Sequence, residues 1–212
     1  MTGSTYDFWL LDLDGTLIDV EESYIHHLFE GVGAELNASF TDREAECLWY
    51  GYGESRAEVL ATHGIDAAEF WDVFHAVEEP ESRAAATHLY PDAEAFVPTL
   101  SEPVGLVTHC QEYLTGPVLE TLDIADWFDT VVCCTDETGW KPDPEPVEMA
   151  MRDLGVAHNG HEGALAGDDP GDIGAAHNAG ITSIHVDRGE SNPPLGEPRP
   201  HQQVATFAEL DG

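Results

Sequence analysis

The stretch FWLLDLDGTL, residues 8–17, indicates how the rest of the chain is built. Four apolar residues come first, which is typical of a strand buried in a sheet, and Asp12, Asp14, Gly15 and Thr16 follow almost at once. In open α/β sheets, ligands bind beyond the carboxyl ends of the strands. We therefore expect this acidic pair to lie where such a sheet carries its chemistry.

The remaining chain alternates short β-rich runs with helical patterns, which is typical of parallel βαβ units. The sequence predicts an α/β fold, with a Rossmann-like, doubly wound parallel sheet and helices on both faces. The predicted strands are residues 7–13, 103–109, 130–135, 163–168 and 182–187. The predicted helices between the later strands are residues 111–123, 143–155 and 171–179.

Residues 20–88 break this alternation and predict an inserted, all-helical cap without a convincing strand. The predicted cap helices are residues 21–36, 42–50, 54–63 and 67–78. We therefore expect a core formed by residues 1–19 and 89–212, and a cap formed by residues 20–88. Residues 189–200 are rich in Pro and Gly and predict a loop, and residues 204–210 predict a short final element.

The composition is strongly acidic, and this favours some classes of protein and excludes others. Of 212 residues, 42% are hydrophobic, 42 are Asp or Glu and 7 are Lys or Arg, for a net charge of −35. This charge indicates adaptation to a salty, halophilic cytoplasm, because molar salt screens the repulsion between like charges. Nucleic acid is not an expected partner, since there is no basic face to meet phosphates. Neither a secretory signal nor a membrane span is predicted, and Cys110, Cys133 and Cys134 are expected to be buried, reduced thiols.

Three further motifs follow predicted strands. Thr108 ends an apolar run and offers a hydroxyl to an anion. Lys141, within a KPDP sequence, is the only lysine in the chain, which favours a functional role. The loop GDDPGD, residues 167–172, places three carboxylates at a strand end, where a bound cation relieves their repulsion.

Taken in order, DLDGTL, Thr108, Lys141 and GDDPGD resemble the motifs of the haloacid dehalogenase-like (HAD) hydrolase superfamily over nearly the whole chain. The helical insert is similar to that family's small cap of the phosphoglycolate phosphatase type. The resemblance implies a phosphatase in which Asp12 is the nucleophile and forms an aspartyl-phosphate. It implies that Asp14 is the general acid and then the base.

The resemblance also implies a cofactor and a set of phosphate contacts. Mg²⁺ is expected on Asp12, the backbone carbonyl of Asp14 and Asp168, with Asp172 as a further ligand or a support. Thr108 and Lys141 are expected to bind the transferring phosphoryl group.

Three further residues are candidates for contacts that the family pattern does not fix. His109 stands where relatives often carry Asn or a small residue, so it either contacts phosphate or caps a strand end. In the cap, Tyr24 either contacts the substrate or packs the hinge. Arg56 either meets an anionic group of the substrate or pairs with a neighbouring glutamate on its helix.

Several functions share these motifs. The expected reaction is hydrolysis of a small phosphorylated metabolite, with phosphoglycolate as the leading candidate. A sugar-phosphate mutase of the same superfamily, a phosphoacceptor signalling domain and a binding protein without turnover stay open as alternatives. A cap lysine that forms a Schiff base is excluded, because residues 20–88 contain no lysine. The sequence leaves the oligomeric state open.

Overall fold

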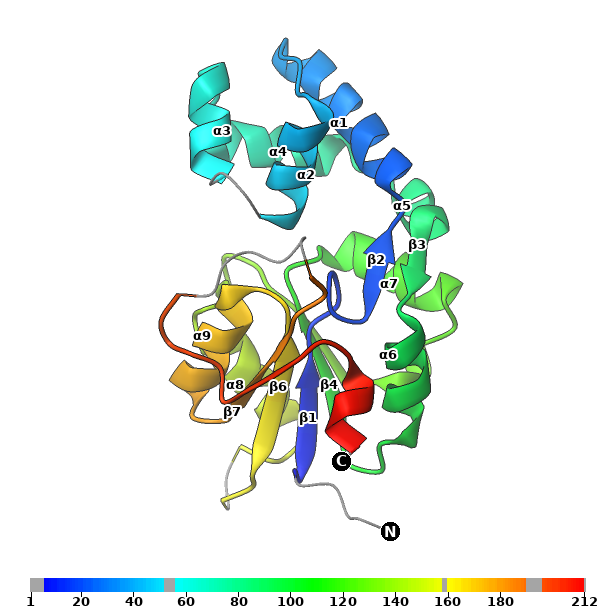
Figure 1. Cartoon of the computed structure of the whole chain (residues 1–212), viewed down its shortest axis with the longest axis vertical. Coiled ribbons are helices and arrows are strands. Elements are labelled where there is room, and N and C mark those ends of the chain that lie inside the picture. The colour runs from blue at the N-terminus through cyan, green and yellow to red at the C-terminus, as the bar shows by residue number, and fades with distance from the viewer. Residues whose placement is uncertain (1–5, 52–55, 158–159, 190–195, 212) are drawn as a thin grey trace.

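A six-stranded parallel sheet forms the core of the computed structural model, which describes residues 6–51, 56–157, 160–189 and 196–211. Its strand order is β5-β4-β1-β6-β7-β8, and every neighbouring pair runs parallel (Figure 1). The strands are β1 (Phe8–Leu11), β4 (Val104–Thr108), β5 (Thr130–Cys133), β6 (Gly163–Gly167), β7 (Thr182–Val186) and β8 (Gln202–Val204). The predicted doubly wound α/β core is confirmed.

Helices cover both faces of this sheet, as the alternation of side chains along β1 requires. Trp9 and Leu11 point to one face and pack in a cluster with residues of α6 (Pro91–Phe96) and α7 (Glu112–Thr121). Phe8 and Leu10 point to the other face. There they pack in a cluster with residues of α8 (Glu145–Asp153) and α9 (Pro170–Ala179). β1 is thus buried on both sides, which explains its uninterrupted apolar sequence.

Four helices form a lobe beyond the carboxyl ends of the strands, at the top of Figure 1. They are α1 (Glu22–Leu36), α2 (Asp42–Tyr50), α3 (Arg56–His63) and α4 (Ala67–Val77). Their apolar faces enclose a separate cluster that is rich in aromatic rings, among them Phe29, Phe70 and Phe74. A core of its own stabilises this lobe independently of the sheet.

The connection between lobe and sheet contains elements that the sequence did not predict. The strands β2 (Ile18–Val20) and β3 (Thr87–Leu89) pair antiparallel, so the expectation of no strand within residues 20–88 is wrong there. Strands of three residues are too short to show a period of two. The helix α5 (Pro80–Ala86) packs against α7, and its Ala84 belongs to the core cluster of Trp9. The division into residues 1–19, 20–88 and 89–212 stays a prediction.

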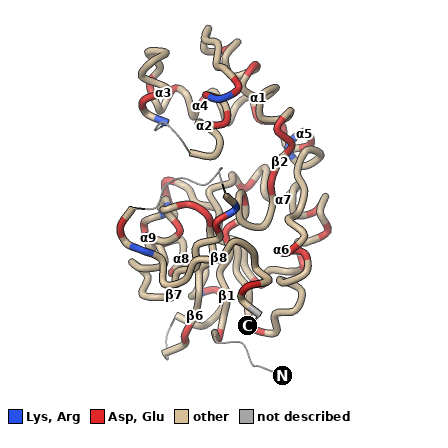
Figure 2. The backbone as a smooth tube through the Cα atoms, viewed as in Figure 1, with Lys and Arg blue, Asp and Glu red and all other residues tan. Residues whose placement is uncertain are grey.

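Other sequence expectations concern the surface and the thiols. Cys47, Cys110, Cys133 and Cys134 are all free thiols; Cys134 is buried as expected, whereas Cys110 and Cys133 are only partly buried. Asp and Glu are spread over both lobe and core, with few Lys and Arg among them (Figure 2). Within the described residues, no helix is long and apolar enough to cross a membrane. Residues 190–195 of the predicted loop and residues 54–55 of the third predicted cap helix lie outside the described residues.

Candidate active site

The sequence motifs converge because three neighbouring parallel strands end at one edge of the sheet. Asp12 follows β1, Thr108 ends β4 and Asp168 follows β6, and both β4 and β6 pair with β1. All three residues line a cavity of about 200 Å³, which the cap residues Trp49, Trp71 and Phe74 also line. The cavity therefore lies between the strand ends and the helical lobe.

Lys141 is the cationic centre of this edge. Its Nζ donates to Asp12 Oδ1 at 2.6 Å, to Asp172 Oδ1 at 2.6 Å and to the carbonyl oxygen of Val107 at 3.0 Å. These acceptors take all three hydrogens of the ammonium group. Burial opposes the charge of Lys141, but the two carboxylates prevail and raise its pKa. The ammonium is therefore charged and fixed in place.

The carboxylates at this edge outnumber the cation beside them. Oxygens of Asp12, Asp168 and Asp172 lie within 4.8 Å of one another. Burial raises the pKa of all three, and repulsion between the carboxylates adds to that effect, while Lys141 lowers the pKa of Asp12 and Asp172. One ammonium leaves two negative charges uncompensated when all three are ionised. A hard divalent cation such as Mg²⁺ fits both the charge and the oxygen donors.

Within this group, Asp168 and Asp172 are held differently. Thr16 Oγ1 donates to one oxygen of Asp168 at 2.9 Å, so its carboxylate keeps free acceptor capacity toward the cavity. Asp172 is fully buried, and its two oxygens accept from Lys141 and from the Asp169 backbone N–H. Asp172 is also the N3 residue of the capping box that starts α9, in which Asp169 is the N-cap. This favours support rather than direct ligation as the role of Asp172.

Asp14 is not part of the cluster formed by Asp12, Asp168 and Asp172. Its side chain forms an ion pair with Arg83 of α5, and it is partly exposed to the cavity. The predicted roles of its carbonyl as a metal ligand and of its carboxyl group as an acid–base group stay predictions.

Thr108 and His109 lie on the other side of Asp12. Thr108 is buried, and its Oγ1 accepts the Cys110 backbone N–H at 3.0 Å. His109 Nε2 accepts the backbone N–H of Lys141 at 3.0 Å, which assigns the ring proton to Nδ1. Burial of the ring, together with the positive charges of Lys141 and Arg56, lowers the pKa of His109. The imidazole is therefore neutral and orients the lysine segment, and a direct phosphate contact stays a prediction.

The two predicted cap residues are placed differently from one another. Arg56 lines the cavity, and it donates to the carbonyl oxygens of Leu48 and Trp49 at 2.9 and 2.8 Å, at the end of α2. Tyr24 is not among the described residues that line the cavity. Its hydroxyl donates to Glu78 at 3.1 Å, which places it behind the cavity wall. The expectation that Tyr24 contacts substrate finds no support in this geometry.

Sequence reasoning missed Arg83 and Glu78. Both line the cavity, and their side chains are buried, with Arg83 1% exposed and Glu78 6% exposed. Neither belongs to a motif or follows a predicted strand. The only available signal was the scarcity of basic residues, which makes each arginine a candidate.

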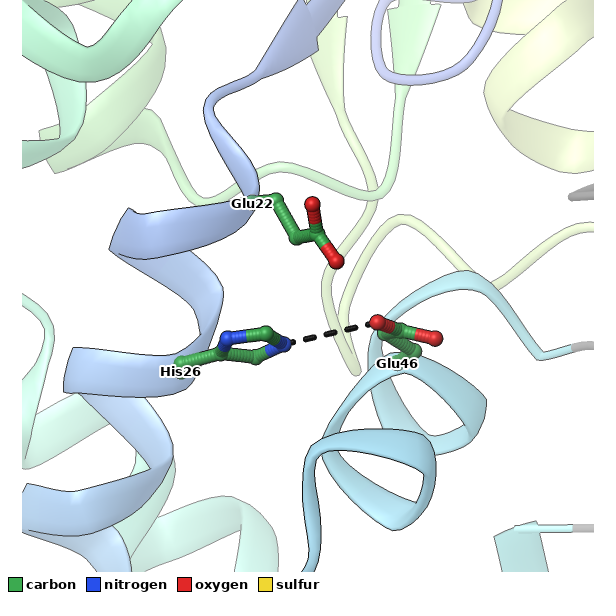
Figure 3. Close-up of side chains that lie close together, drawn as sticks. All are labelled: Glu22, His26 and Glu46. Carbon is green, nitrogen blue, oxygen red and sulfur yellow. Dashed lines mark hydrogen bonds and ion pairs between the residues drawn. The ribbon is translucent and has the colours of Figure 1, made fainter.

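A second group of possible metal ligands lies in the cap (Figure 3). Glu22 and His26 extend from α1 toward Glu46 of α2, and His26 Nε2 lies 3.4 Å from Glu46 Oε1. Glu22 is exposed, and the hydrogen bond between His26 and Glu46 joins the two helices. This contact accounts for the group without a bound ion.

Comparison with known proteins gives the same architecture. The sequence matches the model of the haloacid dehalogenase-like hydrolase family over residues 9–186. It is 27% identical to the phosphoglycolate phosphatase of Yersinia pseudotuberculosis, covering 94% of this chain and 89% of that protein. It is 30% identical to the pyrophosphatase PpaX of Oceanobacillus iheyensis, covering 84% and 81%. A crystal structure of a putative phosphoglycolate phosphatase from Lactobacillus plantarum has a TM-score of 0.79, with 20% identity and coverage of 97% and 98%.

The chain is thus an α/β protein with a Rossmann-like parallel sheet, an inserted helical lobe and a carboxylate–lysine cluster at the strand ends. The chain belongs to the haloacid dehalogenase-like hydrolase family.

Proposed function

We propose that this protein is a Mg²⁺-dependent phosphatase that hydrolyses a small phosphorylated metabolite through an aspartyl-phosphate on Asp12. The observation that carries the proposal is the position of Asp12 in a buried cluster, with Lys141 Nζ 2.6 Å from one oxygen. A fixed ammonium beside the nucleophile stabilises the negative charge that gathers on the phosphoryl oxygens in the transition state. Family membership and the phosphatase names of the relatives support the same reaction.

The mechanism has two displacements. In the first, a carboxylate oxygen of Asp12 attacks phosphorus, the ester bond breaks, and Asp14 gives its proton to the departing oxygen. In the second, Asp14 takes a proton from water, which attacks the phosphorus of the aspartyl-phosphate. Inorganic phosphate leaves, and the Asp12 carboxylate and the Asp14 acid are restored. In both steps the Thr108 hydroxyl binds a phosphoryl oxygen, and the positive charge of the Lys141 ammonium stabilises the phosphoryl group.

Asp12 and Asp168 are the side chains that would hold Mg²⁺, with the backbone carbonyl of Asp14 as a further ligand and Asp172 as a support. The bound cation supplies positive charge that lets an anionic carboxylate approach an anionic phosphate. His109 orients the lysine segment by accepting the Lys141 backbone N–H. Closure of the cap excludes bulk water until the covalent intermediate has formed.

The substrate class follows from the size of the site. A cavity of about 200 Å³ lies below the range of about 300–1,000 Å³ that drug-sized ligands occupy, so it favours a small metabolite. Phosphoglycolate is the leading candidate, because several relatives carry the name phosphoglycolate phosphatase. We infer a cytoplasmic enzyme without nucleic-acid or membrane partners, working in a salty cell. A sugar-phosphate mutase of the same superfamily is the alternative.

The test is phosphate release from an aryl phosphate in molar KCl, with Mg²⁺ and with a chelator. Turnover is expected with Mg²⁺ only, and Asp12→Asn is expected to lose at least about 1,000-fold in kcat, because it removes the nucleophile. Asp126→Asn, an exposed position, is the matched control and is expected to keep wild-type turnover.

Other results would point elsewhere. Stable phosphorylation of Asp12 by a small phosphodonor without release of phosphate would favour a phosphoacceptor protein. Transfer of the phosphoryl group between two hydroxyls of a sugar phosphate would favour a mutase. Neither turnover nor labelling, in a folded sample given a panel of phosphorylated metabolites, would contradict the proposal and favour a binding protein.

A further inference from the structure

Arg83 extends from α5 into the cavity beside Asp14. Its Nη2 forms an ion pair with Asp14, its Nε lies 3.7 Å from Glu78 Oε1, and its guanidinium lies 4.9 Å from the ring centre of Trp49. The side chain is 1% exposed, yet Nη1 has no hydrogen-bond partner among the residues that the structure describes. A buried N–H group without an acceptor lowers the stability of the fold by about 1–3 kcal/mol. A ligand that accepts from Nη1 would remove this cost.

We propose that Arg83 is the specificity-determining residue of this enzyme, and that its Nη1 binds an anionic oxygen on the leaving group of the substrate. The proposal rests on the phosphatase function proposed above and adds the chemical class of the substrate. That class is a phosphate monoester or anhydride whose leaving group carries a carboxylate or a second phosphate close to the bridging oxygen.

The position of Asp14 beside Arg83 indicates that Arg83 binds the leaving group and not the transferred phosphoryl group. Asp14, as general acid, must contact the bridging oxygen that departs. Because Arg83 already bonds Asp14 through Nη2, the adjacent Nη1 lies within a few bond lengths of any group next to that oxygen. The transferred phosphoryl group lies instead at Asp12 and Lys141.

The other cations that line the cavity are already engaged. Lys141 contacts Asp12 and Asp172, in the part of the site that we assign to the transferred phosphoryl group, and Arg56 donates to two backbone carbonyls of α2. Nη1 of Arg83, by contrast, has no acceptor among the described residues, and each of its two N–H groups can donate to an anionic oxygen in the plane of the guanidinium.

The carboxylates beside Arg83 do not cancel its attraction for an anion. Glu78 accepts the Tyr24 hydroxyl at 3.1 Å, and burial raises the pKa of Glu78 to about 7, although the charge of Arg83 opposes this. At neutral pH this carboxyl group is therefore only partly ionised. Asp14 occupies a different nitrogen of the guanidinium, so a substrate oxygen and Asp14 do not compete for one donor.

The experiment compares kcat/KM for 2-phosphoglycolate, for its neutral amide and for pyrophosphate, in wild type and in Arg83→Met. We expect wild type to prefer at least one anionic substrate over the amide by about 10- to 100-fold, the range for a lost charge-assisted hydrogen bond. Arg83→Met is expected to reduce this ratio toward one. The two anionic substrates separate a carboxylate from a second phosphate as the group that is bound.

A purely structural role for Arg83 predicts a different pattern. If Arg83 only positions Asp14 or joins the cap to the core, the variant lowers both rates by the same factor, and the unchanged ratio would overturn the proposal. Arg83→Lys, which keeps the charge but lacks the second arm, serves if Arg83→Met does not fold, and is expected to lose most of the preference. Arg152→Lys, at an exposed arginine of α8, is the matched control and is expected to keep it.

Binding without turnover gives an independent readout. Calorimetry measures the Kd of each ligand for Asp12→Asn and for the double variant Asp12→Asn/Arg83→Met. We expect the double variant to bind 2-phosphoglycolate or pyrophosphate about 10- to 100-fold more weakly, and to bind inorganic phosphate with unchanged Kd. Equal weakening for all three ligands would contradict the proposal. Aryl phosphate turnover without any anion preference overturns only the role of Arg83, whereas absence of turnover on every substrate overturns the proposed function first.

Discussion

Glu78 is the buried carboxyl group of the cavity wall that lies outside the cluster of Asp12, Asp168 and Asp172. It lies between the hydroxyl of Tyr24 and the guanidinium of Arg83, on the chain segment that leads from α4 to α5. Burial raises its pKa to about 7 from an ordinary value of 4.5, while Arg83 opposes the shift. The ionisation of one side chain therefore affects the stability of the whole protein near neutral pH.

The sign of this effect is fixed by proton uptake. Between the ordinary pKa and about 7, the folded protein keeps a proton on Glu78 that the unfolded chain has lost, so raising the pH destabilises the fold. We expect the free energy of unfolding of wild type, relative to Glu78→Gln, to fall by about 1 kcal/mol per pH unit between about pH 5 and pH 7. Urea unfolding of both proteins in molar KCl measures it. A difference that does not vary with pH would show that the pKa of Glu78 is not raised.

At the scale of elements, the loop after β1 and the loop after β6 approach each other closely. Gly15 has φ +78°, and a Cβ atom built on it would lie 2.4 Å from Asp168 Oδ2. Two constraints therefore act on this glycine: a left-handed backbone and the absence of room for any side chain. Gly15 therefore leaves room for the Asp168 carboxylate at the edge of the sheet where Asp12 lies.

Gly15→Ala separates these two constraints when it is compared with Gly64→Ala. Gly64 has φ +69° but nothing within 4 Å of a built Cβ, so its substitution is expected to cost only the backbone strain of about 1–2 kcal/mol. Gly15→Ala is expected to cost more than Gly64→Ala and to weaken Mg²⁺ binding at least about tenfold, because Asp168 must move. Urea unfolding and Mg²⁺ titration by calorimetry measure the two effects. Equal stability losses and equal Mg²⁺ affinities would show that Asp168 tolerates the methyl group.

At the scale of the whole molecule, charge is the dominant feature. A net charge of −35 on 212 residues spreads over both the core and the cap (Figure 2). Like charges on a folded chain repel one another, and the repulsion extends about 10 Å at 0.1 M salt but about 3 Å at 1 M. The fold is therefore expected to depend on the salt concentration.

We expect the thermal midpoint to rise by at least about 10 °C between dilute buffer and molar KCl, since a change of about 1 kcal/mol already shifts it by about 2–4 °C in a domain of this size. Differential scanning fluorimetry across a KCl series measures the shift. Sucrose at matched osmolality is the control, because it acts by exclusion from the protein surface and does not screen charge. A midpoint that is the same in both buffers would rule out adaptation to high salt.

The sequence was sufficient wherever the signal is local. The apolar runs predicted five of the six strands of the sheet, all but the edge strand β8, and the residues directly after them predicted Asp12, Thr108 and Asp168, because parallel strands end at a common edge. The isolation of Lys141 as the only lysine indicated its importance before its contacts were known. The short elements β2, β3 and α5 were not predicted, because segments of three to seven residues show too little periodicity in hydrophobicity.

Only the tertiary structure decided which charged side chains lie buried together. Arg83 is 69 residues from Asp14 in the sequence, and no local pattern marks it, yet packing of α5 against α7 brings the two into an ion pair. Tyr24 likewise lies behind the cavity wall through its hydrogen bond to Glu78, and Nη1 of Arg83 has no partner among the described residues. Burial and pairing are properties of segments that meet in space. A strand end can therefore be recognised from its own residues, whereas a buried guanidinium cannot.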